Sequence, residues 1–321
     1  MTVFSSARVR YNLAREGFCV EKVRVAIVGW GNVGRGAAEA IVSSPDFELV
    51  AVVRRRVEPD QKVQGQGWAA PAVGSLAEAG SVAGALICLP TRLAEAAELD
   101  ILRSGVSVVD SFDIHGEALW AHRQALDAAA RQGGSVAVTA AGWDPGADSL
   151  VRCIMEALAP RGVTYTDFGP GMSMGHSVAA RSVAGVADAL SFTLPTGFGT
   201  HRRQVYVELD GSRPFDDVVA DIRNDPYFAH DDTRITLVES AADHHDTGHG
   251  VSLRRYGSAG NAGNNHMEWT MRVVNPAATG SCMLSALRAG LKQTPGAYTM
   301  AELPPLHMLP GSLEETLKRI V

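Results

Sequence analysis

The chain has 321 residues, 46% of them hydrophobic, and a formal net charge of −6. Acidic and basic residues are interspersed, which excludes the basic stripe of a nucleic-acid-binding surface. No apolar run approaches the ~20 residues that cross a bilayer, so a membrane-spanning protein is excluded as well.

The first half of the chain alternates between strands and helices. Residues 1–22 lack the apolar centre of a signal peptide and are expected to form an N-terminal extension. The alternation predicts an α/β fold, a Rossmann-type doubly wound parallel sheet, as a dinucleotide-binding domain over residues 23–144. The predicted strands are 23–29, 47–53, 84–90, 106–110 and 135–142, and the predicted helices are 35–44, 92–105 and 116–134.

After about residue 145 the pattern changes, and strands separated by turns dominate. They predict a second α+β domain, residues 145–292, with a mixed, largely antiparallel sheet and a second function. The tail returns to helix at 281–293 and 313–321, and we expect residues 293–321 to pack back onto the first domain. The predicted strands are 163–169, 189–197, 203–211, 233–240, 250–258 and 266–276, with helices at 148–160 and 215–224.

The four cysteines show no metal-binding or redox spacing. Cys19, Cys88, Cys153 and Cys282 are far apart in the chain. We therefore expect reduced thiols, a cytoplasmic location and no bound metal.

A glycine motif follows the first predicted strand. Gly29, Gly31 and Gly34 form G-x-G-x-x-G between a buried strand and a helix, which is the context that dinucleotide binding requires. The first glycine permits the turn, the second lets a pyrophosphate approach the backbone, and the third allows close helix–strand packing. The motif therefore predicts a dinucleotide cofactor.

Three arginines stand where an NAD-binding site usually carries an acid. Arg54, Arg55 and Arg56 follow the second predicted strand. A guanidinium holds a 2′-phosphate by charge-assisted hydrogen bonds, whereas a carboxylate would repel it. We expect NADP, with Arg54 and Arg55 as the favoured phosphate ligands.

Candidate catalytic acids follow the later strands of the first domain, near the expected nicotinamide. Asp110 and Asp113 follow one strand, and Asp144 follows another. Paired carboxylates suit a substrate amine, because they hold an ammonium and one can accept a proton. Asp110 is equally well read as a turn cap, and Asp144 is also a plausible turn former. Segments 88–91, 110–115 and 141–146 are the candidates for the nicotinamide end.

The second domain offers candidate anchors for a carboxylate. A glycine-rich loop at 167–177 presents backbone N–H groups, and Arg202 and Arg203 begin a strand. His249 lies between two glycines. The His244–His245 pair has no further ligand at convincing spacing, so we expect no metal there.

With these residues in view, the sequence resembles the meso-diaminopimelate dehydrogenase family. The resemblance covers the chain from about residue 23 and implies an NADP-dependent oxidative deamination at the D-configured centre of meso-2,6-diaminopimelate. The product, L-2-amino-6-oxopimelate, cyclises to tetrahydrodipicolinate, and the reverse reaction serves lysine and cell-wall precursor synthesis. It also implies a homodimer formed through the substrate domain. The matching stretches are "RVAIVGWGNVGR", "VDSFDIHGE", "AGWDPGADSLVR", "FGPGMSMGHS", "LPTGFGTHRRQVYVEL", "DTGHG" and "PGAYTMAELP".

The resemblance also implies site residues. Either Asp113 or Asp144 is the base, and both lie near the D-centre amine. Neighbouring asparagines, Asn261 and Asn264, are alternatives to Asn265. The implied substrate ligands are Asp113, Trp143, Asp144, Phe168, Met174, Gly175, Thr193, Arg203, His249 and Asn265. The cofactor ligands are Gly29, Trp30, Gly31, Asn32, Val33, Gly34, Arg54, Arg55, Arg56, Cys88, Leu89, Pro90, Thr91, Ser111, Phe112, Asp113, Ala141, Gly142, Trp143, Asp144 and Pro145.

Two alternatives use the same first domain. One is another NADP oxidoreductase, of the dihydrodipicolinate reductase or homoserine dehydrogenase type, which needs no acid pair for an amine. The other is a non-enzymatic NADP-sensing protein that uses its second sheet for a partner. The acids at the strand ends favour an enzyme, since a sensor does not need them.

Overall fold

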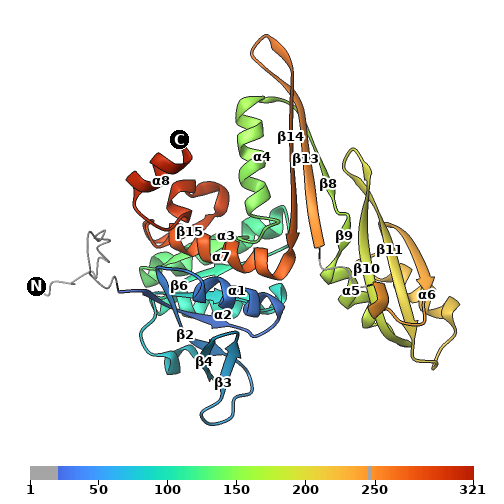
Figure 1. Ribbon diagram of the computed structural model, residues 1–321, viewed down its shortest axis with the longest axis horizontal. Helices are drawn as coiled ribbons and strands as arrows, with labels where there is room; N and C mark the ends of the chain where they lie inside the picture. The colour runs from blue at the N-terminus through green and yellow to red at the C-terminus, as the bar shows by residue number, and fades with distance from the viewer. Residues whose placement is uncertain (1–20, 245–247) are drawn as a thin grey trace, which may run out of the picture. The chain divides into compact units, whose positions relative to one another are not determined.

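The structure is a computed structural model that describes residues 21–244 and 248–321. The chain divides into two compact units (Figure 1). Unit 1 comprises the chain up to Ala141 together with Gly280–Val321, and unit 2 is Gly142–Thr279. The expected N-terminal extension, apart from its last two residues, and Cys19 lie outside the described residues.

Unit 1 is built on an eight-stranded sheet, ordered β15-β7-β6-β5-β1-β2-β4-β3, in which only the β3–β4 pair is antiparallel. The predicted doubly wound parallel sheet is confirmed. The strands are β1 (Val23–Val28), β2 (Phe47–Val53), β3 (Lys62–Gly65), β4 (Trp68–Val73), β5 (Gly84–Ile87), β6 (Ser107–Asp110), β7 (Val136–Thr139) and β15 (Gly296–Thr299). The helices are α1 (Asn32–Val42), α2 (Thr91–Arg103), α3 (Glu117–Gly133), α7 (Asn275–Gly290), which starts in unit 2, and α8 (Leu313–Ile320).

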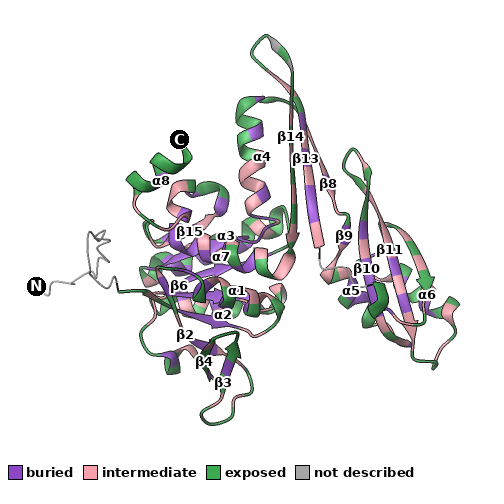
Figure 2. Cartoon of the chain, in the orientation of Figure 1, coloured by how far each residue is buried: buried purple, intermediate pink, exposed green. Residues whose placement is uncertain are grey.

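The central strands of unit 1 are apolar because both faces of the sheet are covered. β5, β6 and β7 are buried at every residue (Figure 2). Leu102 of α2 and Leu126 of α3 are fully buried in the same core cluster. Continuous burial on both faces explains why these strands read as unbroken apolar runs rather than as alternating ones.

Helix α7 joins the sheet of unit 1 rather than the second domain. A Cβ on Gly280 would lie 2.4 Å from the backbone N of Ala37, and Leu287 contacts Gly84. We expected the chain to return to the first domain at about residue 293, but it returns at Gly280, about a dozen residues earlier. Because α7 is buried along most of its second half, its sequence does not show where the chain crosses between units.

Unit 2 contains two sheets of three and four strands. One is ordered β12-β11-β10-β9 and the other β14-β13-β8, and β11–β12 is the parallel pair in an otherwise antiparallel arrangement. The predicted mixed, largely antiparallel character is confirmed. The strands are β8 (Arg161–Phe168), β9 (Gly171–Met172), β10 (Val186–Gly197), β11 (Thr200–Leu209), β12 (Asp232–Leu237), β13 (Gly248–Ala259) and β14 (Ala262–Val274). The helices are α4 (Ala147–Leu158), α5 (Met174–Arg181) and α6 (Phe215–Asn224).

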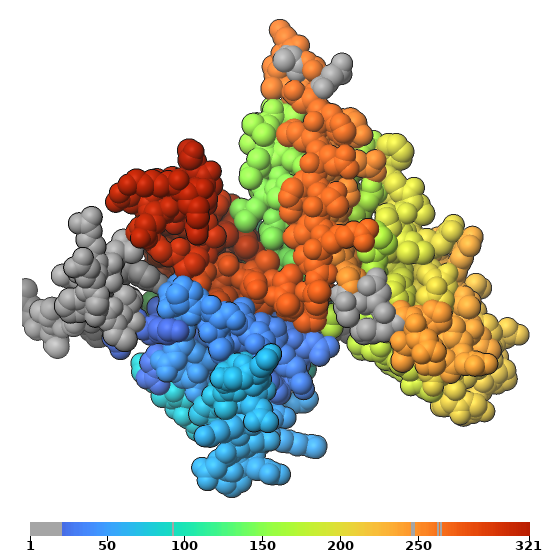
Figure 3. All heavy atoms as spheres, in the orientation of Figure 1, coloured from blue at the N-terminus to red at the C-terminus, as the bar shows by residue number. Residues whose placement is uncertain are grey.

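A buried arginine ties α4 to the three-stranded sheet. Arg255 of β13 is 1% exposed, and its Nε and Nη2 donate to the carbonyl oxygen of Ala159, just beyond α4. Its Nη1 donates to Thr164 of β8. Figure 3 shows α4, in green, beside the β13–β14 hairpin, in orange. Burying a guanidinium is tolerated here because each of its nitrogens has an acceptor.

In the part of the chain that the structure describes, no helix combines the length and apolarity needed to cross a membrane. Within residues 21–244 and 248–321, Cys88 and Cys153 form no disulfide bond.

Candidate active site

The glycine motif forms a tight turn with one open position. Gly29 has φ +102°, and a Cβ there would lie 2.5 Å from the carbonyl oxygen of Cys88. A Cβ on Gly34 would lie 2.4 Å from the carbonyl oxygen of Gly29, whereas one on Gly31 would have no atom within 4 Å. The outer glycines are therefore required by packing, and the middle one leaves space against the backbone for a ligand.

Helix α1 begins at this open position. Gly31 is its N-cap, no side chain caps it, and its first turn contains no acidic residue. The first N–H groups of a helix have no partner within it, and the helix dipole places positive charge there. Trp30, Asn32 and Val33 stand in the same turn. This arrangement suits the pyrophosphate of a dinucleotide.

The three arginines lie directly after β2. The N–H of Arg54 donates to the carbonyl oxygen of Val73 (2.9 Å), which fixes the start of the segment. Arg54 is half-buried, and Arg55 and Arg56 are exposed. Among residues 21–244 and 248–321, no group pairs with any of the three guanidinium groups, so all of them are available to an anion.

The strand order places the glycine motif at the reversal point of the sheet. β1 lies between β2 and β5, and connections lead away from it in both directions. Ligands of doubly wound sheets bind at this point, beyond the carboxyl ends of the strands. The segments that follow the neighbouring strands β5, β6 and β7 at this edge are Cys88–Leu89–Pro90–Thr91, Ser111–Phe112–Asp113 and Ala140–Ala141.

Two of these strand-end segments are joined by a hydrogen bond. The hydroxyl of Thr91 donates to Oδ1 of Asp113 at 2.7 Å, and Asp113 is exposed. The second oxygen of this carboxylate has no hydrogen-bond partner in the described chain. Burial raises the pKa of the Cys88 thiol to about 12, so this cysteine is not a nucleophile. Asp113 therefore has one exposed carboxylate oxygen at this edge of the sheet that a ligand could contact.

Asp110, the other strand-end acid, is committed to structure. Its Oδ1 accepts hydrogen bonds from the N–H groups of Phe112 (2.8 Å) and Ala140 (2.9 Å) and from the hydroxyl of Thr139 (3.0 Å). Its Oδ2 lies 3.4 Å from Nε2 of His122. Asp110 therefore ties the end of β6 to the end of β7, which agrees with the turn-cap interpretation.

A histidine and three carboxylates lie behind this strand end. His122 is 2% exposed, with its ring nitrogens 2.9 Å from Glu95 and 3.3 Å from the fully buried Glu98. Burial lowers the pKa of His122, but hydrogen bonds to Asp110, Glu98 and Glu95 outweigh it and raise the pKa to about 10. Burial raises the pKa of Glu98 to about 7. The imidazolium neutralises part of the carboxylate charge, and its ring stacks on Phe112 at 4.3 Å.

Unit 2 begins with the Trp143–Asp144 turn. The N–H of Gly142 donates to the carbonyl oxygen of Pro145 (3.0 Å), and the Asp144–Pro145 peptide bond is cis. Trp143 is buried, and its ring lies 5.3 Å from that of His249. Nδ1 of His249 accepts the N–H of Gly250 at 2.7 Å, which leaves the proton on Nε2. Asp144 directly follows Trp143 in the sequence and is half-buried. Asp113 belongs to unit 1.

A threonine and an arginine pair across β10 and β11. Thr193 and Arg203 are register partners, and Nη1 of Arg203 donates to the hydroxyl of Thr193. Nε of Arg203 donates to Oδ2 of Asp231 at 2.6 Å. The Arg203 side chain is 11% exposed. A positive charge is thus fixed in a largely buried position, as an anchor for a carboxylate requires.

The glycine-rich segment brings this pair next to His249. Gly171 of β9 pairs with Thr193, and a Cβ on Gly171 would lie 2.7 Å from Cα of His249. Phe168 pairs with Val251 on the adjoining strand. Met174 and Gly175 begin α5 two residues after β9. Thr193, Arg203, His249 and Phe168 are therefore gathered in one region of unit 2.

Asn265 does not belong to this region. It pairs with Gly257 near the tip of the β13–β14 hairpin, whereas His249 lies eight residues earlier on β13, about 26 Å along the strand. Asn261 lies at the same tip, and the Asn264 side chain is outside the described residues. The expected assignment of Asn265 is therefore wrong in position.

Asn275 is a further candidate that the sequence did not single out. It follows β14 directly and starts α7, and its neighbour Val274 is the register partner of Gly248, next to His249. Its Oδ1 accepts the hydroxyl of Thr279 at 3.0 Å, which leaves its amide N–H₂ as a donor. The signal available in the sequence was an Asn-Pro pair at a strand-to-helix junction.

Two protein families match this chain, one within unit 1 and the other within unit 2. Residues 23–110 match an oxidoreductase family with an NAD-binding Rossmann fold, and residues 142–199 match the diaminopimelic acid dehydrogenase C-terminal domain. The chain is 46% identical over 302 residues to a meso-diaminopimelate D-dehydrogenase of Bacteroides fragilis, covering 94% of this chain and all of that protein. The chain belongs to the meso-diaminopimelate D-dehydrogenase family.

A second meso-diaminopimelate D-dehydrogenase agrees with this chain in length, and two solved structures agree with it in fold. The enzyme of Acetivibrio thermocellus is 32% identical, over 95% of this chain and 99% of its own. The structure of C. glutamicum DAP dehydrogenase in complex with DAP has a TM-score of 0.82 at 30% identity, covering 94% of this chain and 99% of that one. An engineered D-amino acid dehydrogenase bound to NADP+ has a TM-score of 0.78 at 29% identity, covering 94% of this chain and all of that one.

Proposed function

We propose that this protein catalyses, in the cytoplasm, the reversible NADP-dependent oxidative deamination of meso-2,6-diaminopimelate at its D-centre. The products are ammonia and L-2-amino-6-oxopimelate, which cyclises to tetrahydrodipicolinate. The observation that carries the proposal is the 46% identity, over the whole length of the relative, to a meso-diaminopimelate D-dehydrogenase. The reverse direction supplies precursors for lysine and the cell wall.

The residues present in unit 1 fit NADP. Gly31 leaves open space at the N-terminus of α1 for the pyrophosphate. The guanidinium groups of Arg54, Arg55 and Arg56 have no partner within the described chain, and these residues stand where NAD-binding proteins place an acid. When bound, NADP accepts a hydride at C4 of its nicotinamide. The other proposed cofactor contacts are the segments Cys88–Thr91, Ser111–Asp113 and Ala141–Pro145 after β5, β6 and β7.

Unit 2 supplies the proposed anchor for the L-configured end of the substrate. Arg203 offers the positive charge, Thr193 a hydroxyl, and Nε2 of His249 a proton donor. We propose that Asn275, rather than Asn265, adds an amide hydrogen bond to this end. Because the L-end carboxylate is fixed, only the D-centre can present its hydrogen to the cofactor, and positioning of this kind supplies much of an enzyme's rate.

Carboxylates act at the D-centre. Asp113 and Asp144 hold the ammonium, and one of them takes a proton as the carbon is oxidised. Water then adds to the imine, and the C–N bond breaks to release ammonia. The hydroxyl of Thr91 donates to one carboxylate oxygen of Asp113, and the other oxygen is left to bind the ammonium or to accept the proton. Trp143, Phe168, Met174 and Gly175 are proposed to line the path of the aliphatic chain.

The decisive assay measures NADPH absorbance with purified protein. We expect reduction of NADP with meso-diaminopimelate, much less reduction of NAD, and none with the L,L isomer. A dihydrodipicolinate reductase or homoserine dehydrogenase would leave NADP unreduced with this amine. A panel of 2-oxo acids with ammonia and NADPH then measures how broad the reverse reaction is.

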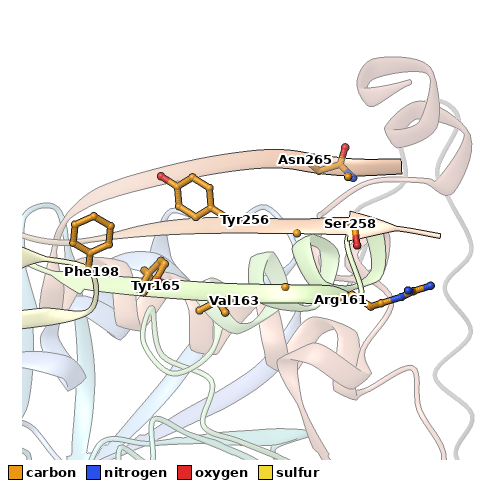
Figure 4. A pocket seen from close by; sticks show the side chains of 10 residues that line it. Arg161, Val163, Tyr165, Phe198, Tyr256, Ser258 and Asn265 are labelled. Carbon is orange, nitrogen blue, oxygen red and sulfur yellow. The ribbon is translucent and has the colours of Figure 1, made fainter. Parts of the chain in front are cut away.

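We also propose a homodimer formed through the exposed face of the three-stranded sheet. Val163, Tyr256 and Phe198 are 53%, 43% and 67% exposed, which is unusual for large apolar side chains gathered on one surface. Figure 4 shows Val163 and Tyr165 of β8, Tyr256 of β13 and Phe198 of the turn between β10 and β11. These side chains line a hollow of about 900 Å³. Light scattering should give twice the chain mass, and Val163→Glu combined with Tyr256→Glu should halve it. A monomeric wild-type protein would contradict the proposal.

A further inference from the structure

We propose that Asp231 is a positioning residue that orients Arg203 so that the substrate's distal carboxylate meets only the terminal nitrogens of the guanidinium group. The inference rests on the proposed function, since it assigns Arg203 to that carboxylate. Asp231 immediately precedes β12, which pairs with β11 in unit 2 (Figure 1).

Two of the three guanidinium nitrogens of Arg203 are already bound. Nε donates its only hydrogen to Oδ2 of Asp231 at 2.6 Å, and Nη1 donates one of its two hydrogens to the hydroxyl of Thr193. Thr193 is 1% exposed and Arg203 is 11% exposed, so both groups hold fixed positions. The hydrogens that remain are one on Nη1 and both on Nη2.

This arrangement decides which edge of the guanidinium group is presented. A carboxylate can bind side-on, to Nε and Nη2, or end-on, to Nη1 and Nη2. Because Asp231 takes the Nε hydrogen, only the end-on edge remains for a second carboxylate. The hydroxyl of Thr193 accepts from Arg203, which turns its own hydrogen toward another acceptor. Thr193 and the end-on edge together form one directed carboxylate site.

Two histidines flank Asp231 without replacing Arg203 as its partner. Nε2 of His176 lies 3.6 Å from Oδ2 of Asp231, and Nε2 of His201 lies 3.5 Å from Oδ1. Burial and the charge of Arg203 lower the pKa of His176 to about 4 and lower that of His201 as well. Both rings are neutral near pH 7, so the ionic partner of Asp231 is Arg203.

The neighbouring residues form a matched ion pair outside this cluster. Nε of Arg202 donates to Oδ2 of Asp232 at 2.7 Å, nearly the geometry of the Arg203–Asp231 pair. The Asp232 side chain is 60% exposed and that of Arg202 is 33% exposed, against 20% and 11% in the inner pair. Exposed pairs contribute little to stability. Asp232 is therefore the control for the removal of a carboxylate from this strand.

The test compares Asp231→Ala, Asp231→Glu and Asp232→Ala with the wild-type enzyme in steady-state kinetics. We expect Asp231→Ala to raise the KM for meso-diaminopimelate by about tenfold to a hundredfold. The KM for NADP should not change, because neither Asp231 nor Arg203 is among the proposed cofactor contacts. Asp231→Glu should restore part of the loss, and Asp232→Ala should behave as wild type.

Each outcome decides between the two proposals. If the wild-type enzyme does not reduce NADP with meso-diaminopimelate, the proposed function fails and this inference fails with it. If the wild type is active and Asp231→Ala has the same KM as Asp232→Ala, only the role of Asp231 is refuted. Should Asp231→Ala lower the thermal midpoint, its kinetics are measured at a temperature where it is folded, and Asp231→Asn, whose amide oxygen can still accept from Nε, should keep a KM closer to that of the wild type. A wild-type KM in folded Asp231→Ala overturns the inference.

Discussion

The imidazole of His122 lies 3.4 Å from the carboxylate of Asp110, inside unit 1 and behind the strand end that carries Asp113. Glu95 and Glu98 contact the same ring, and the Phe112 ring stacks on it. A buried positive charge thus supports the loop that presents the proposed catalytic acid. The arrangement makes the stability of unit 1 depend on pH.

Stability should fall as pH rises from about 6.5 to about 10. The pKa of His122 is about 10 in the folded protein and near its ordinary value of about 6.5 when unfolded. The folded state therefore binds more protons in this range, so stability falls with pH. The raised pKa of Glu98 acts in the same direction at lower pH. Thermal midpoints of the wild type and His122→Gln should converge toward pH 10, and exposed His115→Gln is the control. A constant difference across the range would refute the assignment.

Removal of the arginines after β2 should affect one cofactor only. Arg54→Ala combined with Arg55→Ala should raise the KM for NADP by about tenfold to a hundredfold, because two charge-assisted hydrogen bonds to the 2′-phosphate are lost. The weak activity with NAD should not fall. Arg103→Ala, which removes an exposed guanidinium from α2, is the control. Unchanged NADP kinetics would contradict the role of these arginines.

Substitutions at two glycines of the motif should affect different properties: Gly34→Ala the stability of the protein, and Gly31→Ala the binding of NADP. Gly34→Ala places a Cβ 2.4 Å from the carbonyl oxygen of Gly29 and should destabilise the protein by about 1–3 kcal/mol. Gly31→Ala has open space and a φ of −91°, so its thermal midpoint should equal that of the wild type. Its KM for NADP should rise, because the added methyl group occupies the proposed phosphate position. Wild-type NADP kinetics in Gly31→Ala would show that the phosphate lies elsewhere.

The two asparagines should differ in their effect on the substrate. Asn275→Ala should raise the KM for meso-diaminopimelate by about tenfold, the effect of one lost hydrogen bond to a charged group. Asn265→Ala, at the tip of the β13–β14 hairpin, should leave it unchanged. The KM for NADP measures whether either variant disturbs unit 1. An effect from Asn265 and none from Asn275 would show that Asn265, and not Asn275, contacts the substrate.

Much of the fold could be predicted because most of its strands are apolar or alternating runs that are bounded by turn residues. The parallel strands of unit 1 and the antiparallel pairs of unit 2 follow from this pattern. The β3–β4 hairpin and β15 were not predicted, because these strands at the two edges of the sheet are only partly buried, whereas the equally short β5, β6 and β7 are buried at every residue. Pairing of such segments depends on tertiary contacts that local sequence does not record.

The site was predictable where a motif fixes geometry and not where register decides it. Gly29, Gly31 and Gly34 act within six residues of chain, so spacing alone describes them. The predicted strands 250–258 and 266–276 already place Asn265 next to the turn between them, but only the pairing of β13 with β14 shows that this turn lies far from His249. Asp231 was missed for a similar reason: it is remote in sequence from Arg203, and parallel pairing of β11 with β12 brings them together.

The three hydrogen bonds accepted by Oδ1 of Asp110 bear on attempts to engineer the enzyme toward new amines. They lock two strand-end loops to one carboxylate, so changing that residue would shift both loops at once. A library that diversifies the substrate pocket should therefore hold Asp110 and His122 constant. Randomisation is better confined to residues such as Phe168 and Met174, whose backbones are fixed by β8 and α5. Variants chosen in this way would change the substrate specificity while the two strand-end loops keep their positions.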